Sequence, residues 1–98
     1  MSIESYYTQI NRYRELKSHL INVVNNLNNA KSNIDQTKSN LESSYTIDDN
    51  PTPIAEKCNS LSLDIIKTSE TLSNKVIPAI DSAILSTKNQ IQALEAEQ

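Results

Sequence analysis

Apolar residues recur at alternating steps of three and four along residues 3–41. Every seventh position of this stretch is apolar, giving the series Tyr6, Tyr13, Leu20, Leu27, Ile34 and Leu41. Further apolar residues lie between these positions, namely Ile3, Ile10, Leu16, Val23, Val24 and Ala30. A sustained repeat of 3.5 residues predicts one long helix whose apolar seam packs against another helix, whereas a strand would alternate every second residue. Such a helix is stable only when the seam is covered.

A second apolar series in the C-terminal half of the chain supplies the cover. Its members are Ile54, Cys58, Leu61, Ile65, Leu72, Val76, Ile80, Ile84, Ile91 and Leu94, with Thr68 or Ser69, and Thr87, filling the gaps. From Leu72 to Ile84 every step is four residues, which predicts local unwinding of a left-handed supercoil. Pro78 is expected to kink this helix, because the pattern continues on both sides of it. A break at Pro78 would instead divide the chain into three helices.

Residues 43–53 interrupt the pattern with two prolines and a short acidic run. Such residues are typical of turns and helix caps. Folding the chain near residue 48 brings Tyr13 to Ile84 and Leu41 to Ile54, so that the numbers of facing residues add up to about 96. We therefore predict an all-α fold with a single domain, residues 1–98, formed by an antiparallel two-helix hairpin with helices over residues 3–43 and 53–96.

The predicted hairpin leaves several apolar side chains uncovered. Those that point away from the seam are Tyr7, Ile21, Leu63, Ile66, Ile77 and Leu85. Each would gain roughly 1.5–3 kcal/mol if fully buried. We expect these residues to bind a protein partner, and the hairpin to complete a four-helix bundle with it. The alternative is that they are ordinary exposed apolar residues of a hairpin without a partner.

Composition argues against catalysis and against nucleic-acid binding. The chain has no glycine, so it lacks glycine-rich phosphate loops and the EF-hand glycine, and its 9 basic and 12 acidic residues are scattered along the sequence. His19 is the only histidine and Cys58 the only cysteine. We expect a surface role for His19 and an apolar core role for Cys58. The sequence thus predicts a protein that is not an enzyme, with no cofactor, no metal and no small-molecule substrate.

Export signals are the remaining sequence feature. The N-terminus lacks the basic and apolar regions of a secretory signal peptide, and no apolar run reaches the length of a transmembrane helix. Tyr45 and Asp49 form a Tyr-x-x-x-Asp pattern in the connecting segment. We interpret it as a candidate recognition signal, with a chance match of so short a pattern as the alternative.

The length, the two long helices and the central breaker resemble the WXG-type (ESX) small proteins of type VII secretion systems. The chain is more similar to the WXG-like hairpins encoded beside LXG toxins in Gram-positive bacteria. The residues that carry this resemblance are the Tyr6-Tyr7 opening with Ile10 and Tyr13, the segment 77–80, and the ending Ile91-x-x-Leu94-Glu95. The Trp-x-Gly turn is missing, and the C-terminal tail has no Tyr-x-x-x-Asp/Glu signal.

The resemblance implies a targeting factor or chaperone. Such a protein would bind the helical N-terminal domain of an LXG effector, alone or beside a second small hairpin. It would be made in the cytoplasm, with co-secretion by a signal-peptide-independent type VII route as a further expectation, and would meet the membrane only through the secretion apparatus. The alternative is a structural coiled-coil homodimer without cargo.

Overall fold

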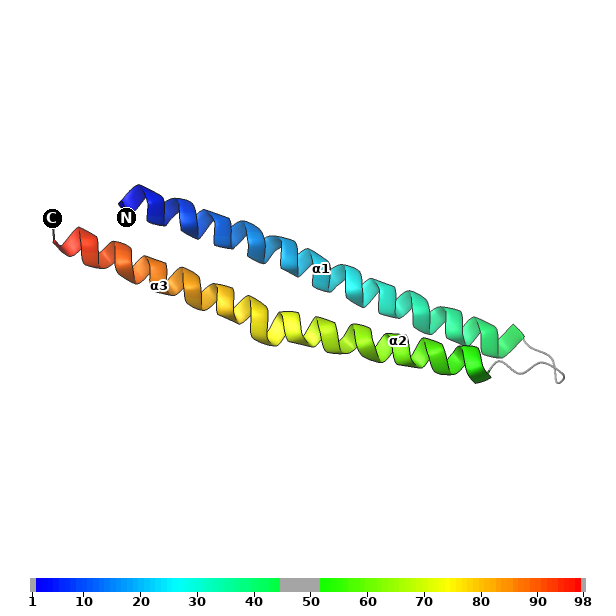
Figure 1. The fold of residues 1–98 in the computed structure, drawn as a ribbon. Coiled ribbons are helices and arrows are strands. Elements are labelled where there is room, and N and C mark those ends of the chain that lie inside the picture. Colours follow the sequence, from blue (N-terminus) through cyan, green and yellow to red (C-terminus); the bar gives the residue numbers. More distant parts are fainter. Residues whose placement is uncertain (1, 45–51, 98) are drawn as a thin grey trace.

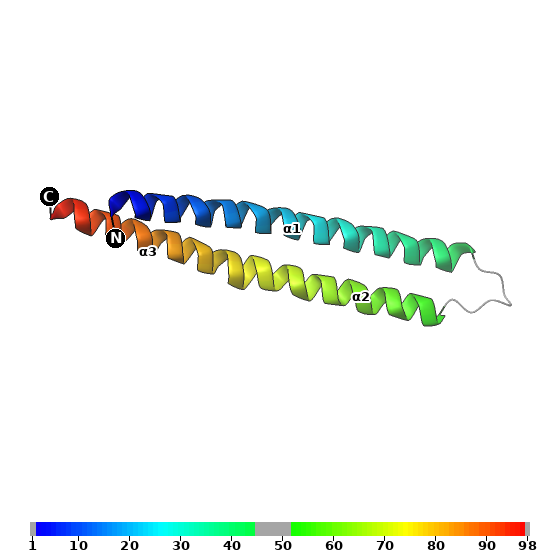
Figure 2. The ribbon, with the colours of Figure 1, turned by 45° about the horizontal axis from the view of Figure 1, so that its top comes forward.

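The computed structural model describes residues 2–44 and 52–97, which form two long antiparallel helical rods (Figure 1). The first rod is helix α1, Ile3–Ser44. The second rod is continuous and consists of α2, Thr52–Thr71, a π-helical turn η1, Leu72–Val76, and α3, Ile77–Ala96. The Cα atoms extend over 79 × 16 × 14 Å, and the beginning of α1 and the end of α3 lie at the same end of the rod pair (Figure 2). The predicted all-α hairpin is confirmed.

Ser2 starts helix α1 as its N-cap. The backbone N–H of Ser5 donates to Ser2 Oγ at 3.2 Å, and the N–H of Tyr6 donates to the Ser2 carbonyl at 3.1 Å. Two N–H groups at the helix start are thereby satisfied. Glu4 lies in the first turn, where a negative charge interacts favourably with the helix dipole.

The heptad pattern of α1 places its covered residues as the sequence predicts. With Tyr6 at position d, every a and d position from Ile3 to Leu41 is buried or half-buried, and Ile10 is exposed by only 2 %. Three a positions are lysines, each with a half-buried stem and an acidic partner. The ion pairs are Lys17–Asp81 at 2.8 Å, Lys31–Asp35 at 2.6 Å and Lys38–Glu42 at 3.7 Å.

Two side-chain hydrogen bonds show the register between the rods. Ser62 Oγ donates to Asp35 Oδ1 at 2.9 Å, and Ser69 Oγ donates to Asn28 Oδ1 at 3.3 Å. The numbers of these facing residues add up to 97, one residue from the predicted register.

The seam of α2 differs from the expected one at two positions. Leu61 and Ile54, both predicted to lie on the seam, are exposed by 51 % and 46 %. Ser62 occupies the seam in place of Leu61 and is exposed by only 6 %. The reason is spacing: Ser62 lies four residues after Cys58 and three before Ile65, which continues the heptad. Of the two candidates for the next gap, Ser69 is buried and Thr68 is exposed.

A π-helical turn lies in the part of the second rod where apolar residues recur at every fourth position, from Leu72 to Ile84. The N–H of Ile77 bonds to the carbonyl of Leu72, five residues back, and the helix continues through Pro78 without a break. The wider turn inserts one extra residue. Val76 and Ile77 consequently both remain half-buried, and Ile80 rejoins the heptad as a d position. The π-helical turn accommodates the extra residue within one turn, in the segment where the sequence predicted local unwinding of the supercoil.

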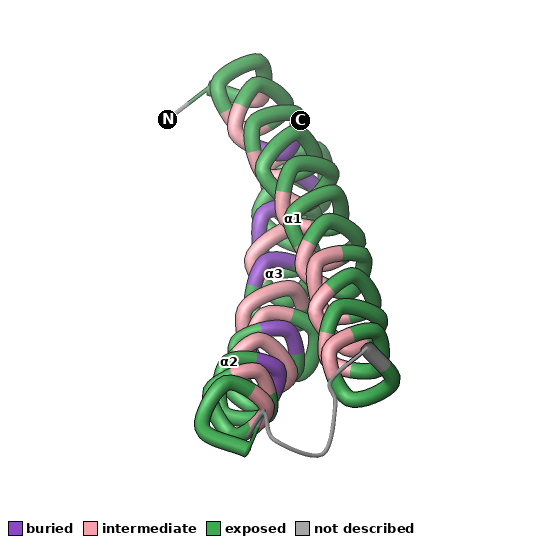
Figure 3. The backbone as a smooth tube through the Cα atoms, turned by 90° about the vertical axis from the view of Figure 1, so that its right-hand side faces the viewer, coloured by how far each residue is buried: buried purple, intermediate pink, exposed green. Residues whose placement is uncertain are grey.

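The covered residues form one stripe along the facing sides of the rods, and its composition changes along the length (Figure 3). We call residues 3–23 and 75–96 the terminal half, and residues 24–44 and 52–74 the distal half. All three buried apolar residues, Ile10, Ile80 and Ile91, lie in the terminal half. The residues buried in the distal half are Ser62 and Ser69. The apolar core of the described residues is therefore concentrated near the chain ends.

Candidate interaction surface

The seam divides the surface of the hairpin into two edges. In an antiparallel pair, the e positions of both helices flank the seam on one side and the g positions flank it on the other. We call the e side, continued outward by the b positions, edge A, and the g side edge B. The contacts Lys17–Asp81, Asp35–Ser62 and Asn28–Ser69 each join an a position to an e position, so all three lie on edge A.

Five of the six residues predicted to bind a partner lie along edge A, and the sixth, Ile77, lies at an a position on the seam. Four of them are well exposed, with exposed fractions of 50 % for Tyr7, 42 % for Ile21, 57 % for Leu63 and 59 % for Leu85. Ile66 and Ile77 are half-buried within the hairpin itself. Ile66 lies at an e position next to the seam, and Ile77 is half-buried because the π-helical turn rotates it inward. The four exposed residues are thus the ones available to a partner.

Tyr7 borders a shallow depression on edge A at the terminal end. The depression has a volume of about 260 Å³ and is lined by Tyr7, Lys88, Ile91, Gln92 and Glu95. The aromatic ring and the edge of buried Ile91 supply its apolar part, while Lys88 and Glu95 supply charge of both signs. An aromatic side chain beside such a depression is typical of an anchor at a protein interface.

Edge B carries four exposed apolar side chains that were not among the residues predicted to bind a partner. Leu16 and Val23 on α1 are exposed by 47 % and 43 %, and Ile54 and Leu61 on α2 occupy equivalent g positions. The signal was present in the sequence, because all four lie one residue before an a position of the strict heptad. Leu61 and Ile54 were assigned to the seam because an apolar residue was preferred over Ser62 and Ala55.

The two edges differ in charge. The e positions of edge A include charged residues on both rods: Arg14, Asp35, Glu42, Asp81, Lys88 and Glu95. The g positions of α1 on edge B are uncharged, namely Gln9, Leu16, Val23, Ala30 and Thr37. On α2 the g positions Ile54, Leu61 and Thr68 are uncharged too, and the next g position of the second rod is the exposed Lys75 in η1. Edge A is thus a mixed surface and edge B an apolar one with little charge.

The described residues offer little chemistry. His19 is exposed and Cys58 is half-buried. The largest titration effect is at Asp35, whose pKa is held below its ordinary value of 3.8 by hydrogen bonds from Lys31 and then Ser62. No group of three His, Cys, Asp or Glu side chains in the described part of the chain is placed to hold a metal ion. Tyr45 and Asp49 lie outside the described residues.

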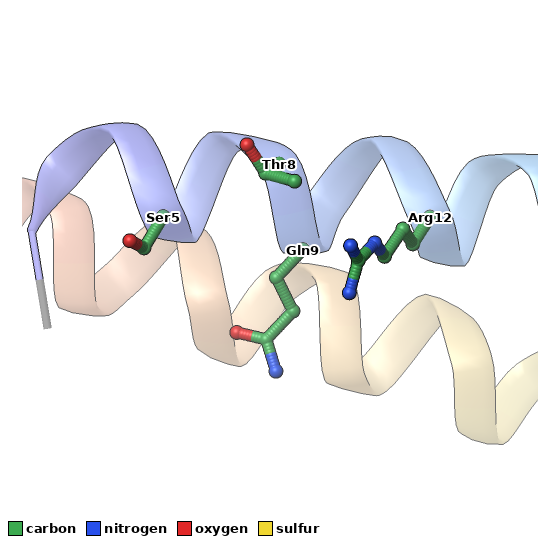
Figure 4. Close-up of a pocket in the computed structure, with 4 residues that line it drawn as sticks. All are labelled: Ser5, Thr8, Gln9 and Arg12. Atoms are coloured by element: carbon green, nitrogen blue, oxygen red, sulfur yellow. The ribbon is translucent and has the colours of Figure 1, made fainter.

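A second depression, of about 340 Å³, lies at the start of α1 (Figure 4). Its lining residues Ser5, Thr8, Gln9 and Arg12 all belong to α1, and Gln9 and Arg12 point toward α3. Gln9 Nε2 donates to the Tyr13 hydroxyl at 3.2 Å, so it acts within the hairpin. The Arg12 guanidinium offers hydrogen-bond donors and no acceptor. The arrangement is a polar flank of one helix with no acid–base pair.

None of the helices in the described ranges combines the length and apolar character that a membrane crossing needs. No family model matches the chain, and no curated protein or solved structure matches it either. Its function is therefore inferred from its own surface.

Proposed function

We propose that this protein is a non-enzymatic interaction protein that packs edge A against a helical partner to complete a four-helix bundle. The observation that carries the proposal is the row of four large apolar side chains, Tyr7, Ile21, Leu63 and Leu85, all between 42 % and 59 % exposed on one edge. They extend over both rods, so a partner covering them contacts both helices. An apolar patch of this extent on a small protein usually marks an interaction site.

The shape of the molecule supports the same function. The chain exposes 7053 Å², whereas a compact monomer of its mass, 11.0 kDa, exposes roughly 5,600 Å². The excess on this one chain, about 1,400 Å², is larger than the roughly 800 Å² that each partner buries in a standard protein interface. A lone two-helix hairpin cannot cover the wide apolar stripe of helices that belong in a bundle. Packing against two further helices removes this excess.

The resemblance to WXG-like proteins suggests the identity of the partner. In this proposal the partner is the helical N-terminal domain of an LXG effector, and the hairpin acts as its chaperone or targeting factor. The mixed charges of edge A suit such a role, because charged residues beside an apolar strip set the register and orientation of a helical partner. The hairpin is made in the cytoplasm and, in this proposal, leaves the cell only with its effector.

The proposal is tested by co-purification with the helical domain of an LXG toxin encoded beside this gene. Leu63→Asp and Leu85→Asp place charges on edge A at side chains that the hairpin does not cover, and we expect each to weaken binding at least tenfold. Ser60→Asp is the matched control, because Ser60 is exposed and faces away from the seam on the same helix. Circular dichroism verifies that all variants keep their helix content.

Two results would contradict the proposal. One is an unmodified hairpin that fails to bind the helical domain while both proteins are folded. The other is binding by the Leu63 and Leu85 variants at the affinity of the Ser60 control, which would place the partner elsewhere on the surface.

A further inference from the structure

Two exposed basic residues lie among the apolar residues of edge A in the terminal half. On α1, Arg14 occupies the e position between Tyr7 and Ile21, each of which is seven residues away. On α3, Lys88 lies three residues after Leu85 and is its neighbour on the helix surface. Neither Arg14 nor Lys88 forms an ion pair within the described residues. Both charges are therefore available to a partner that covers these apolar side chains.

The acidic residues of the same half of edge A leave these two charges unopposed. Asp81 is held by Lys17 at 2.8 Å. Glu4 and Glu95 lie nearer to the chain ends than Tyr7, and Glu4 is in the first turn of α1, where it interacts favourably with the helix dipole. The centre of the terminal half of edge A is thus positively charged.

The distal half of edge A has the opposite charge. The exposed Leu63 lies at a b position of α2, and the b positions seven residues before and after it are Glu56 and Glu70. Both glutamates are exposed, and neither forms an ion pair within the part of the chain that the structure describes. The other two acidic residues of this half, Asp35 and Glu42, are paired with lysines of α1. An acidic partner is therefore attracted to the terminal half and repelled from the distal half.

The depression beside Tyr7 provides space for one apolar side chain of such a partner. It has a volume of about 260 Å³, and its lining combines Tyr7 and Ile91 with the basic Lys88. A partner residue that enters it can therefore be followed by a carboxylate that meets the ammonium group. From Tyr7 to Ile21 the edge is roughly 21 Å long at 1.5 Å per residue, which is about four turns of one helix.

We propose that the terminal half of edge A binds an acidic amphipathic helix, whose carboxylates meet Arg14 and Lys88. The apolar face of this helix covers Tyr7, Leu85 and Ile21. The inference rests on the proposed function and deepens it, since it names the chemistry of the partner segment. It also fixes the position of that segment along the rods, because the unpaired glutamates of the distal half repel it there.

Two helix-stapled peptides of about 21 residues, or three heptads, test the charge of the partner. Both carry leucine at their a and d positions, and the flanking residues are glutamate in one peptide and lysine in the other. We expect the full chain to bind the acidic peptide at least tenfold more tightly, as measured by fluorescence anisotropy. The formal charge of the chain is −3, so attraction by the overall charge alone would favour the basic peptide.

Charge-reversal variants locate the site. We expect Arg14→Glu/Lys88→Glu to weaken binding of the acidic peptide at least tenfold. Raised ionic strength should weaken binding to the unmodified chain more than binding to this variant. The matched control is Arg12→Glu/Lys57→Glu, which makes the same change in charge at exposed c positions, away from edge A, on the same two rods. Circular dichroism verifies that both variants keep their helix content.

Three results would overturn the inference. The first is an acidic peptide that does not bind, or that binds no more tightly than the basic one. The second is binding of the acidic peptide that Arg14→Glu/Lys88→Glu retains at the affinity of the control. The third is a chain that covers this stretch with its own copy, seen in light scattering as a dimer that Leu85→Asp converts to a monomer.

Failure of the proposed function is a separate result, because it is measured with the effector domain. A chain that binds the acidic peptide as expected but not the effector domain retains this inference and loses the proposed partner. A chain that binds the effector domain, yet shows no preference between the peptides, retains the proposed function and loses this inference.

Discussion

Asp35 connects the two rods at one level of the distal half. It accepts a hydrogen bond from Ser62 across the seam and forms an ion pair with Lys31 one turn earlier on α1. Both partners favour the charged carboxylate, which is why its pKa lies below the ordinary 3.8. Ser62 in turn needs this acceptor, because a hydroxyl that is only 6 % exposed is costly without a partner. Ser62 can thus be buried on the seam because Asp35 on the other rod accepts its hydrogen bond.

The lowered pKa of Asp35 predicts an acid-sensitive contribution to stability. A group whose pKa is depressed by folding stabilises the hairpin above its ordinary pKa, and this contribution is lost as the pH falls through the folded pKa. We expect the difference in melting temperature between the unmodified protein and Asp35→Asn to shrink on acidification below about pH 4. Thermal melts followed by circular dichroism over that range measure it. A difference independent of pH would show that the charge of Asp35 contributes nothing.

At the scale of the helix, the π-helical turn η1 joins two segments whose heptad repeats are offset by one residue. The residues before it follow the frame of Ser62 and Ser69, and those after it follow the frame of Ile80 and Ile91. One inserted residue separates these frames, since a continuous α-helix would rotate α3 by about 100° per extra residue. Pro78 is the second residue after η1 and has no N–H to donate. The extra residue and the proline are thus accommodated at the same place.

We predict that the hairpin keeps its stability when one residue is deleted from η1 and loses stability when one residue is deleted from α3. In a Pro78→Ala background, removing exposed Asn74 should join the two frames into one α-helix and keep the melting temperature or raise it. Removing exposed Ser82 in the same background is the control. It should rotate Ile84 and Ile91 off the seam and lose roughly 1.5–3 kcal/mol per side chain. Equal melting temperatures for the two deletions would show that η1 does not set the frame.

At the scale of the whole molecule, the two halves of the hairpin have different cores. The terminal half buries Ile10, Ile80 and Ile91, whereas the distal half buries Ser62 and Ser69. Apolar burial contributes most of the free energy of folding, so the halves differ in local stability. Three of the four exposed edge A residues, Tyr7, Ile21 and Leu85, lie in the terminal half, and only Leu63 lies in the distal half. Binding on edge A is therefore expected to stabilise mainly the terminal half.

Amide hydrogen exchange measures this gradient. We predict faster exchange for the helical amides around Ser62 and Ser69 than for those around Ile10 and Ile80, because local opening of the distal half exposes less apolar surface. The variant Ser69→Leu should slow exchange in the distal half and leave the terminal half unchanged. Uniform protection along both rods would contradict the proposed difference between the halves.

Much of this fold was predictable, because the heptad on residues 3–41 is uninterrupted and its a and d positions can only be satisfied by a second helix. The boundaries of the rods followed from the prolines between them, and the register from the position of the turn. The exposed Tyr7, Leu63 and Leu85 also followed from the period, since they lie off the seam in any register.

Other features depended on the contact between the rods. Apolar character alone favoured Leu61 over Ser62, but the heptad spacing places Ser62 on the seam, where Asp35 of the opposite helix accepts its hydrogen bond. Apolar character likewise assigned Ile66 and Ile77 to the outer surface, whereas local winding half-buries them. By itself the sequence determined two helices and a seam, because periodicity is a property of each helix alone. The tertiary structure decided how far flanking residues such as Ile66 and Ile77 are covered, because that depends on the opposite helix and on the π-helical turn in the second rod.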